Sequence, residues 1–553
     1  MTSMNRRRFL KLGLKGAAVA LTPFDLIMRL LLEGPHGKSY AAANSNMRYF
    51  MIHQPYSPSR WMFDLLLNPW NDPKFKSNAQ MGTILKVGAN DRYTAADYVL
   101  TRFSGQGADG IYMPPMWGFN LPTTSTPTRQ LSSLIPNMLH LRGINTTNPS
   151  HEISKDYLFS PIGATKTVSA LATELSADPI PAVALHPRLI GTRVNTYIYK
   201  SPNGATSITL NSSNYIKELT DTFSWPKEHA PSNSPFAEAT TRLSKQVETF
   251  QGELDKELAN DNSSYDLVLA SRREMRSLLS RGLGDPIQTW NTLLAKYTTI
   301  IRSTFTSRFP GLSDKTVGAG SGGGVSHLIS GAPPPSTDIH ALLAPAGVTV
   351  RGLAELFAAA EFIFNNNLSA SVVGNHEHII GLADPYVRID PDQHTTGSLT
   401  TTYFNTMMFS ALGACLLEFV DFLKNKGLYE TTLIEIASEF NRSPKALDGG
   451  ADHAFMGASS MIFSGAIKGP LVIGNISQED TSGIYTGATY GIGAPNPELG
   501  GGSLTPAQRA ATIAAMVGVT SPVSSAKSAV KKEREGKIVG EAGVGPGQIV
   551  GTS

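Results

Sequence analysis

Apolar residues in this chain form short continuous runs that alternate with longer stretches of helical periodicity. Four runs have the length and the β-branched or aromatic content of buried strands, at residues 47–52, 138–141, 371–373 and 432–437. Before the last run, apolar residues recur at helical spacing from Phe409 to Leu423, and Gly427 predicts the end of that helix. This alternation predicts an α/β fold in which helices flank a largely parallel central sheet.

Three further segments differ from this alternation. Residues 236–303 carry a charged amphipathic pattern and predict a helical insertion packed on the main domain. Residues 316–336 are rich in Gly, Ser and Pro and predict a flexible loop, without the Lys-Ser/Thr of a phosphate-binding loop. Residues 524–553 combine charges with glycines and predict a mobile, solvated tail. The main domain is therefore expected to cover residues 44–523.

The first 43 residues have the pattern of a twin-arginine export signal. Arginines at positions 6–8 precede a moderately apolar run over residues 12–32, and Ala43 ends a small-residue cleavage site. Three charged side chains lie inside that run, and each costs about 2.5 to 3.5 kcal/mol at the centre of a bilayer. We therefore expect a periplasmic or exported protein that meets the membrane only during export. An uncleaved anchor at the membrane surface is the alternative.

Charge and cysteine content narrow the possible functions. Removing the seven Lys/Arg and two Asp/Glu of residues 1–43 from totals of 47 and 44 leaves 40 and 42, so the remaining chain is near neutral. It has no basic stripe, and no nucleic-acid partner is expected. Cys415 is the only cysteine, so no intrachain disulfide can form. This composition suits the twin-arginine route, which carries chains folded in the cytoplasm, where a metal can be loaded.

The densest group of chemically interesting residues follows the apolar run 432–437. Glu439 comes directly after this run, and Asp452 and His453 follow soon afterwards, with Arg442 between them. Hard cations and zinc bind carboxylates and imidazoles held at rigid strand ends. The segment therefore predicts a metal site at one end of a strand.

Two other groups offer metal ligands. Asp390, Asp392 and His394 can bring a carboxylate and an imidazole to one cation, although the two aspartates would also cap a turn around the intervening proline. His376 and His378 follow the third apolar run at alternate positions and would face the same side of a strand. If this pair binds, the site shifts toward zinc or a later transition metal. Solvated histidines in a polar loop are the alternative.

Ser150 precedes a predicted helix that begins at His151. At this junction its hydroxyl lies beside free helix amides, which favour a developing alkoxide and an anionic substrate. Serine is also the ordinary N-cap residue, so a purely structural role stays open. His151 is a candidate ligand or acid, with a surface residue beside the cap as the alternative.

These motifs together resemble one family. Residues 438–444 read Ser-Glu-Phe-Asn-Arg-Ser-Pro, residues 449–453 read Gly-Gly-Ala-Asp-His, and both follow an export signal. The pattern is similar to the Ser-Glu-Phe-Gly-Arg-Thr-Pro and Gly-x-Asp-His motifs of the twin-arginine-exported family called domain of unknown function 1501, which is grouped with the alkaline phosphatase and sulfatase superfamily. The likeness spans about residues 47–475 and is most specific over residues 438–474.

This resemblance implies an alkaline phosphatase-like domain that hydrolyses phosphate or sulfate esters. Superfamily enzymes hold two divalent cations at strand ends, which stabilise the attacking and leaving oxygens. The implied cofactor is one or two ions of zinc, manganese or calcium, and the implied partner is a small-molecule ester. Ser150 would be the nucleophile, with His151 beside it. The implied ligands are Asp392 or Asp390, His394, Glu439, Asp452 and His453.

The sequence departs from the family pattern at two positions. Where active superfamily members usually present an Asp ligand on the first strand, this chain has His53 and Gln54. Asn441 stands where the family usually has Gly. Losing a carboxylate removes negative charge from a dinuclear site. The alternative is therefore a catalytically degenerate member that acts as a binding or structural protein of the cell envelope. An isomerase or transferase on the same scaffold is a third hypothesis.

Overall fold

The structure is a computed structural model of the chain, and it describes the following residues. The longer described segments are residues 47–54, 111–124, 128–176, 286–307, 351–375, 398–444, 451–454, 456–474 and 502–541. Asp178 and short strands at 86–87, 91–92, 101–103, 182–185, 207–210, 316–318 and 336–338 complete them. The predicted signal (1–43) and the first part of the predicted insertion (236–285) lie outside the described residues.

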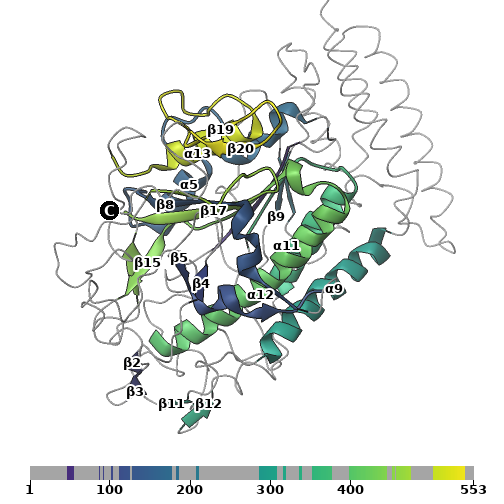
Figure 1. Ribbon diagram of the computed structural model, residues 1–553, viewed down its shortest axis with the longest axis vertical. Helices are drawn as coiled ribbons and strands as arrows, with labels where there is room; N and C mark the ends of the chain where they lie inside the picture. The colour runs from purple at the N-terminus through teal and green to yellow at the C-terminus, as the bar shows by residue number, and fades with distance from the viewer. Residues whose placement is uncertain are drawn as a thin grey trace, which may run out of the picture.

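A largely parallel sheet forms the centre of the molecule, as the sequence predicted (Figure 1). Its eight described strands follow the order β10-β9-β13-β1-β14-β17-β8-β18. Seven run in one direction, and β17 runs antiparallel between β14 and β8. Their bounds are Arg48–His53 (β1), Met138–Ile144 (β8), Ala182–Leu185 (β9), Ser207–Leu210 (β10), Ser371–Asn375 (β13), Thr432–Ala437 (β14), Ala458–Phe463 (β17) and Leu471–Ile473 (β18).

Short hairpins and 3-10 turns connect or extend this core. The paired short strands are β2 (Lys86–Val87) with β3 (Asp91–Arg92), β4 (Thr101–Phe103) with β5 (Ile111–Met113), β6 (Asn120–Leu121) with β7 (Arg129–Gln130), β11 (Thr316–Gly318) with β12 (Ser336–Asp338), and β15 (Asn441–Pro444) with β16 (Ala451–Ala454). The 3-10 turns are η2 (Pro115–Gly118), η3 (Leu131–Asn137), η4 (Val168–Ala170), η5 (Ala172–Leu175) and η8 (Tyr429–Thr431). The strands β11 and β12 pair at the two ends of the predicted flexible loop, whose interior lies outside the described residues.

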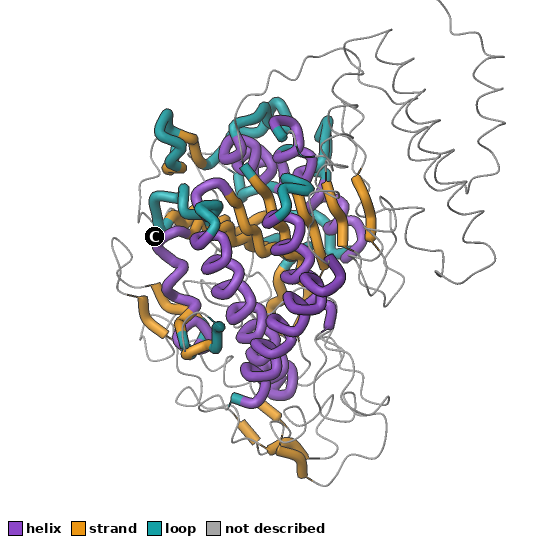
Figure 2. Tube along the Cα trace, turned by 90° about the vertical axis from the view of Figure 1, so that its right-hand side faces the viewer, coloured by secondary structure: helices purple, strands orange, loops and turns teal. Residues whose placement is uncertain are grey.

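Helices cover both faces of the sheet because its central strands are apolar on both sides. One face carries α9 (Pro286–Thr306), α11 (Arg351–Asn365) and α12 (Ser398–Asn425), which lie side by side (Figure 1). Figure 2 shows helices packed against the strands of the sheet. In β1, Phe50 and Ile52 pack against this layer, whereas Tyr49 and Met51 pack on the opposite face. The period of two along the strand thus supplies both cores.

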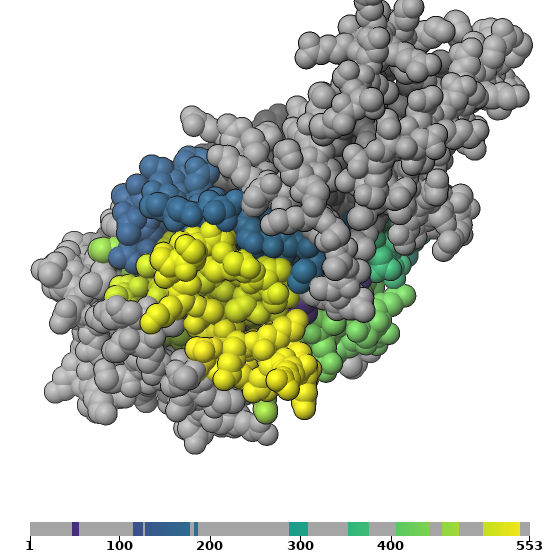
Figure 3. Space-filling view, turned by 90° about the horizontal axis from the view of Figure 1, so that it is seen from above, coloured from purple at the N-terminus to yellow at the C-terminus, as the bar shows by residue number. Residues whose placement is uncertain are grey.

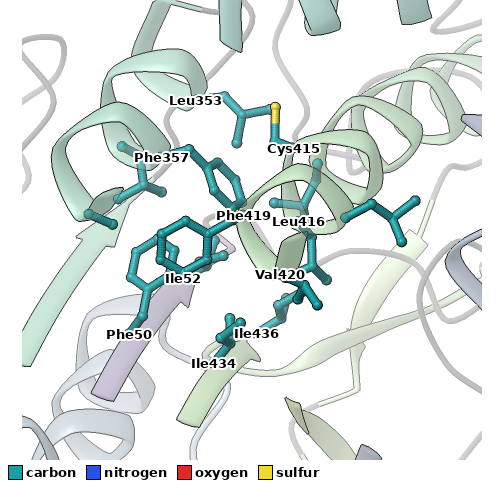
Figure 4. Close-up of a cluster of buried hydrophobic side chains, with 14 of the residues drawn as sticks. Phe50, Ile52, Leu353, Phe357, Cys415, Leu416, Phe419, Val420, Ile434 and Ile436 are labelled. Atoms are coloured by element: carbon teal, nitrogen blue, oxygen red, sulfur yellow. The ribbon is translucent and has the colours of Figure 1, made fainter. Parts of the chain in front are cut away.

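The first layer is built around aromatic side chains. Phe357 of α11 meets Phe50 of β1 and Phe419 of α12 edge-on, with ring centroids 5.6 Å and 5.8 Å apart (Figure 4). Trp290 and Tyr297 of α9 are fully buried in the same core. Within the predicted helical insertion (236–303), α9 is helical and forms part of the helix layer, while the insertion as a whole stays a prediction.

The second face carries α5 (His151–Phe159), α13 (Pro506–Val517) and the hairpin of β19 (Val530–Lys532) and β20 (Ile538–Gly540). The C-terminal segment and the α5 region together cover much of this side of the molecule (Figure 3). Val530 and Ile538 are fully buried in the second core. The prediction of a mobile tail was therefore wrong for residues 524–541, because alternate apolar side chains of the hairpin bury against α13.

By length and composition, helix α12 is apolar enough over Asn405–Asn425 to cross a membrane, yet 89% of this apolar stretch is buried inside the fold. We interpret it as the central core helix. It ends as the sequence predicted, at Gly427 in the left-handed region with φ of 68°. The amides of Gly427 and Leu428 donate to the carbonyls of Lys424 and Leu423, so the last turn is satisfied before β14 begins.

Gly474, directly after β18, is expected to tolerate no side chain. Its φ is 82°, and a Cβ there would lie 2.2 Å from the backbone carbonyl oxygen of Arg142. Replacing it with alanine should lower the free energy of unfolding by about 2 to 4 kcal/mol, because backbone strain adds to a clash with fixed backbone. The control is Gly518→Ala, which has φ of 93° but no atom within 4 Å. If urea unfolding shows the same loss of stability for Gly474→Ala and Gly518→Ala, the clash with Arg142 costs no free energy.

Candidate functional site

The candidate site lies at the carboxyl edge of the sheet, where β1 and β14 end side by side. His53, the last residue of β1, pairs in register with Ala437, the last residue of β14. The next amide, that of Gln54, donates to the carbonyl of Ala437 at 2.8 Å. In open α/β sheets this edge is where ligands bind. The chain then places Glu439 two residues beyond β14.

Glu439 lies between two imidazoles that come from different elements. Its Oε2 is 2.9 Å from Nε2 of His53, and its Oε1 is 2.7 Å from Nδ1 of His151, the first residue of α5. The hydroxyl of Ser438 also donates to Oε2, at 3.1 Å. Glu439 and His53 are fully buried, whereas the side chain of His151 is 26% exposed. The His151 side chain therefore gives this buried cluster its contact with solvent.

Burial and hydrogen bonding set the charges of this cluster. Burial alone would raise the pKa of Glu439, but the hydrogen bonds with His151 and His53 outweigh it and hold this pKa well below its ordinary value. Burial lowers the pKa of His53, and Glu439 offsets only part of that effect. The carboxylate is thus anionic and the His53 ring neutral.

A neutral His53 carries its proton on Nε2, because that nitrogen must donate to the carboxylate. Its other nitrogen, Nδ1, is buried and has no hydrogen-bond partner among the described residues. A buried polar atom without a partner is costly and calls for an explanation such as a bound ion or water. This nitrogen carries a lone pair and is therefore a candidate to coordinate a metal ion or to accept a hydrogen bond from a ligand.

Acidification is expected to destabilise the metal-free protein. The pKa values of His53 and Glu439 are lowered in the folded protein from ordinary values of 6.5 and 4.5, so the unfolded chain binds more protons as pH falls below each value. This stabilisation is present above the ordinary values and is lost on acidification. Urea unfolding between about pH 7 and about pH 5 should show a steeper loss for wild type than for His53→Gln. If the free energy of unfolding falls equally with pH in both proteins, His53 is not a source of this pH dependence.

Ser150 occupies the N-cap of α5, as one of its two predicted roles required. Its side chain nevertheless makes no capping hydrogen bond. Its backbone amide donates to Oδ1 of Asn148 at 2.8 Å, and the ring of His151 packs on Phe440 at 4.7 Å between centroids. The hydroxyl of Ser150 is therefore not committed to the helix terminus, and its role as nucleophile stays a prediction.

Asn441 has a structural reason at the position where the family usually has Gly. Its fully buried Oδ1 accepts from the amide and the hydroxyl of Ser459, at 2.7 and 3.0 Å. This side chain thereby fixes the start of β15 to the antiparallel strand β17. The departure from the family pattern is therefore compatible with an ordered site.

The remaining predicted site residues are placed only in part. In the hairpin of β15 and β16, Arg442 stands opposite His453, and Asp452 opposite Ser443. The hairpin begins two residues after Glu439, so the backbone brings these positions to the same edge of the sheet. The other predicted ligands lie outside the described residues: Asp390, Asp392, His394, His376 and His378. Within the described segments, no three Asp, Glu, His or Cys side chains form a group able to hold a metal ion.

The structure adds one residue that the motifs missed. Lys155 is buried on α5, four residues after His151, and its charge contributes to the lowered pKa of His53. The i, i+4 spacing on one helix face was the sequence signal that could have found it.

Comparison with protein families adds an independent observation on this region. The family model described as Protein of unknown function (DUF1501) matches residues 392–483. No curated protein and no solved structure matched the chain. The matched segment contains α12, β14, Glu439 and the hairpin with Asp452 and His453. The match agrees with the resemblance of the motifs, and the chain is similar to this family over residues 392–483.

Proposed function

We propose that this protein is an exported, metal-dependent hydrolase of phosphate or sulfate esters. The observation that carries the proposal is Glu439, a buried carboxylate held by imidazoles from β1 and α5 at the carboxyl edge of the sheet. The sheet, parallel except for β17, supports an alkaline phosphatase-like fold. The arginine-rich start of the sequence supports export by the twin-arginine route.

The donor types at this edge fit a divalent metal. Carboxylates and imidazoles are ligands of zinc and manganese, and Nδ1 of His53 is a buried donor without a hydrogen-bond partner among the described residues. The residues proposed to hold one or two ions are Glu439, Asp452, His453, His394 and Asp392 or Asp390, with His53 as a further candidate. A bound ion would polarise the phosphoryl or sulfuryl oxygen.

The protein's own residues have distinct proposed roles. Ser150 would lose its proton and attack the phosphorus or sulfur, the bond to the ester's alcohol would break and release that alcohol, and water would then hydrolyse the seryl ester. This role is supported by the place of Ser150 at an N-cap without a side-chain cap bond. His151 would hold and release a proton at the edge of the cluster, since its side chain is the one partly open to solvent. Glu439 orients this imidazole through the hydrogen bond to Nδ1.

Elemental analysis of the purified protein tests the metal. We expect one or two divalent ions per wild-type chain and their loss from the Asp452→Ala, His453→Ala double variant. The control replaces Glu533 and Glu535, exposed in the turn of the C-terminal hairpin, with alanine and should keep the metal. Wild-type protein that stays metal-free after incubation with zinc, manganese and calcium would refute metal dependence. A panel of phosphate and sulfate esters then tests hydrolysis.

A catalytically degenerate binding protein of the cell envelope is the second candidate. It is favoured by His53, which stands where the superfamily usually has an Asp ligand. Nε2 of this histidine is hydrogen-bonded to Glu439. Folded, exported protein that hydrolyses no ester in the panel would favour this candidate over the hydrolase.

A further inference from the structure

Lys155 is a buried cation beside the candidate site. It lies on α5 four residues after His151, so the two side chains share a face of the helix. Its side chain is 9% exposed. The charges of Lys155 and His151 both act on the ring of His53. The charge of the ammonium group therefore reaches the cluster around Glu439, although no hydrogen bond joins the two within the described residues.

The charge of Lys155 is poorly compensated within the protein. In the described part of the chain, its Nζ has one carboxylate within ion-pair distance, Oε1 of Glu152 at 3.5 Å. That partner is 52% exposed. Because water screens the exposed carboxylate of Glu152, this long ion pair offsets little of the cost of burying the ammonium group. The charge of Lys155 also acts on the exposed carboxylate of Asp156. Among the described residues, however, no buried carboxylate lies within ion-pair distance of this buried ammonium group.

Two neighbouring features also point to a missing ligand. Nδ1 of His53 is fully buried and has no hydrogen-bond partner among the described residues, and its lone pair suits the metal ion of the proposed site or a hydrogen-bond donor rather than the anion itself. The first turn of α5, a nine-residue helix, lacks a side-chain cap from Ser150, and helix N-termini attract negative charge. A tetrahedral oxyanion placed near this turn would offer oxygens to the helix terminus and to the ammonium group.

We infer that Lys155 is a substrate-binding residue that takes the anionic phosphate or sulfate group of the ester at the amino-terminal turn of α5. The inference rests on the proposed function and names a recognition residue outside the family motifs. Lys155 provides the positive charge that binds the oxyanion, while the residues around Glu439 carry out the proposed hydrolysis. Charge recognition by one ammonium group accounts for an anionic ester and excludes a neutral one.

Titration of the full, metal-loaded protein with inorganic phosphate and, separately, inorganic sulfate tests this inference. Lys155→Met should weaken binding of the preferred anion about 10- to 100-fold, because a hydrogen bond to a charged group is lost. Lys155→Arg should recover part of the affinity. The matched control, Glu152→Gln, removes the carboxylate that contacts Lys155 and should change affinity less than about 3-fold. The preferred anion distinguishes phosphate from sulfate esters.

Binding and turnover separate this inference from the proposed hydrolysis. Anion binding that depends on Lys155 in a protein that hydrolyses no ester would support the inference and refute the hydrolase. Hydrolysis with KM and anion affinity unchanged in Lys155→Met would overturn the inference and leave the hydrolase standing. A folded Lys155→Met protein with a lowered unfolding midpoint but wild-type anion affinity would show a structural role, and wild-type protein that binds neither anion would also overturn the inference.

Discussion

Replacement of Arg509 by methionine is expected to lower the free energy of unfolding by about 3 to 5 kcal/mol. Nε and one terminal nitrogen of Arg509, on α13, each donate to the carboxylate of Glu435 on β14 at 2.6 Å. Both residues are buried, and the hydroxyls of Tyr49 and Ser460 donate to the same carboxylate. Removing the guanidinium would leave a buried carboxylate without its counter-charge.

Urea unfolding of three variants checks this prediction. Lys537→Met removes a surface pair with Glu430, whose side chains are 40% and 72% exposed, and should cost less than about 1 kcal/mol. The double variant Arg509→Met, Glu435→Gln should be less destabilised than Arg509→Met, because it removes the stranded charge as well. If the Arg509→Met protein is as stable as the Lys537→Met control, the prediction is wrong.

The same arginine connects the scaffold to the candidate site. Its remaining terminal nitrogen donates to the carbonyl of Leu158 at 2.7 Å, near the end of α5. Arg509 therefore links β14, which leads to Glu439, with the helix that begins at His151. We expect Arg509→Met to affect the geometry of the site in addition to stability.

Glu439→Gln is expected to reduce kcat/KM for the preferred ester by about 10²- to 10⁴-fold, a prediction that rests on the proposed function. The carboxylate receives hydrogen bonds at both oxygens, from His53 and His151. A glutamine has the same shape but presents an NH₂ group to one of these imidazoles and carries no charge. The orientation of His151 and any metal bound at Glu439 should both be affected.

The matched control for this variant is Glu361→Gln. Glu361 is also a buried glutamate, but it lies on α11 in the opposite helix layer, where it accepts from Tyr297 and Lys296 at 2.6 Å. This control should lose stability and keep kcat/KM within about 3-fold, since it is remote from the reacting groups. If Glu439→Gln retains wild-type turnover and only unfolds more easily, Glu439 is structural.

The elements with strong periodic patterns were predictable from the sequence. The strands β1, β8, β13 and β14 and the end of α12 at Gly427 were confirmed. The antiparallel direction of β17 was not predictable, because an apolar run indicates burial but not strand direction. The C-terminal hairpin was missed since the charged turn between β19 and β20 hides the alternation around Val530 and Ile538.

The candidate site was predictable in its parts but not in its assembly. Glu439, His151 and His53 were each singled out by residue type and neighbouring strands or helices. Their contacts span 288 and 386 positions of the sequence, and no local pattern reports such pairings. The roles of Asp392 and His394 as ligands stay predictions, since these residues lie outside the described segments.

The burial of α12 has a consequence for the order of events in the cell. In an unfolded chain, Asn405–Asn425 would meet a translocation channel as a hydrophobic segment of the kind that halts transfer and lodges in the lipid. In the folded protein, packing against α9, α11, the sheet and the turns η2 and η3 buries this stretch. On the proposed export route, the chain must therefore finish folding before transport. A folded chain would be released into the periplasm, whereas an unfolded one would insert into the membrane at α12.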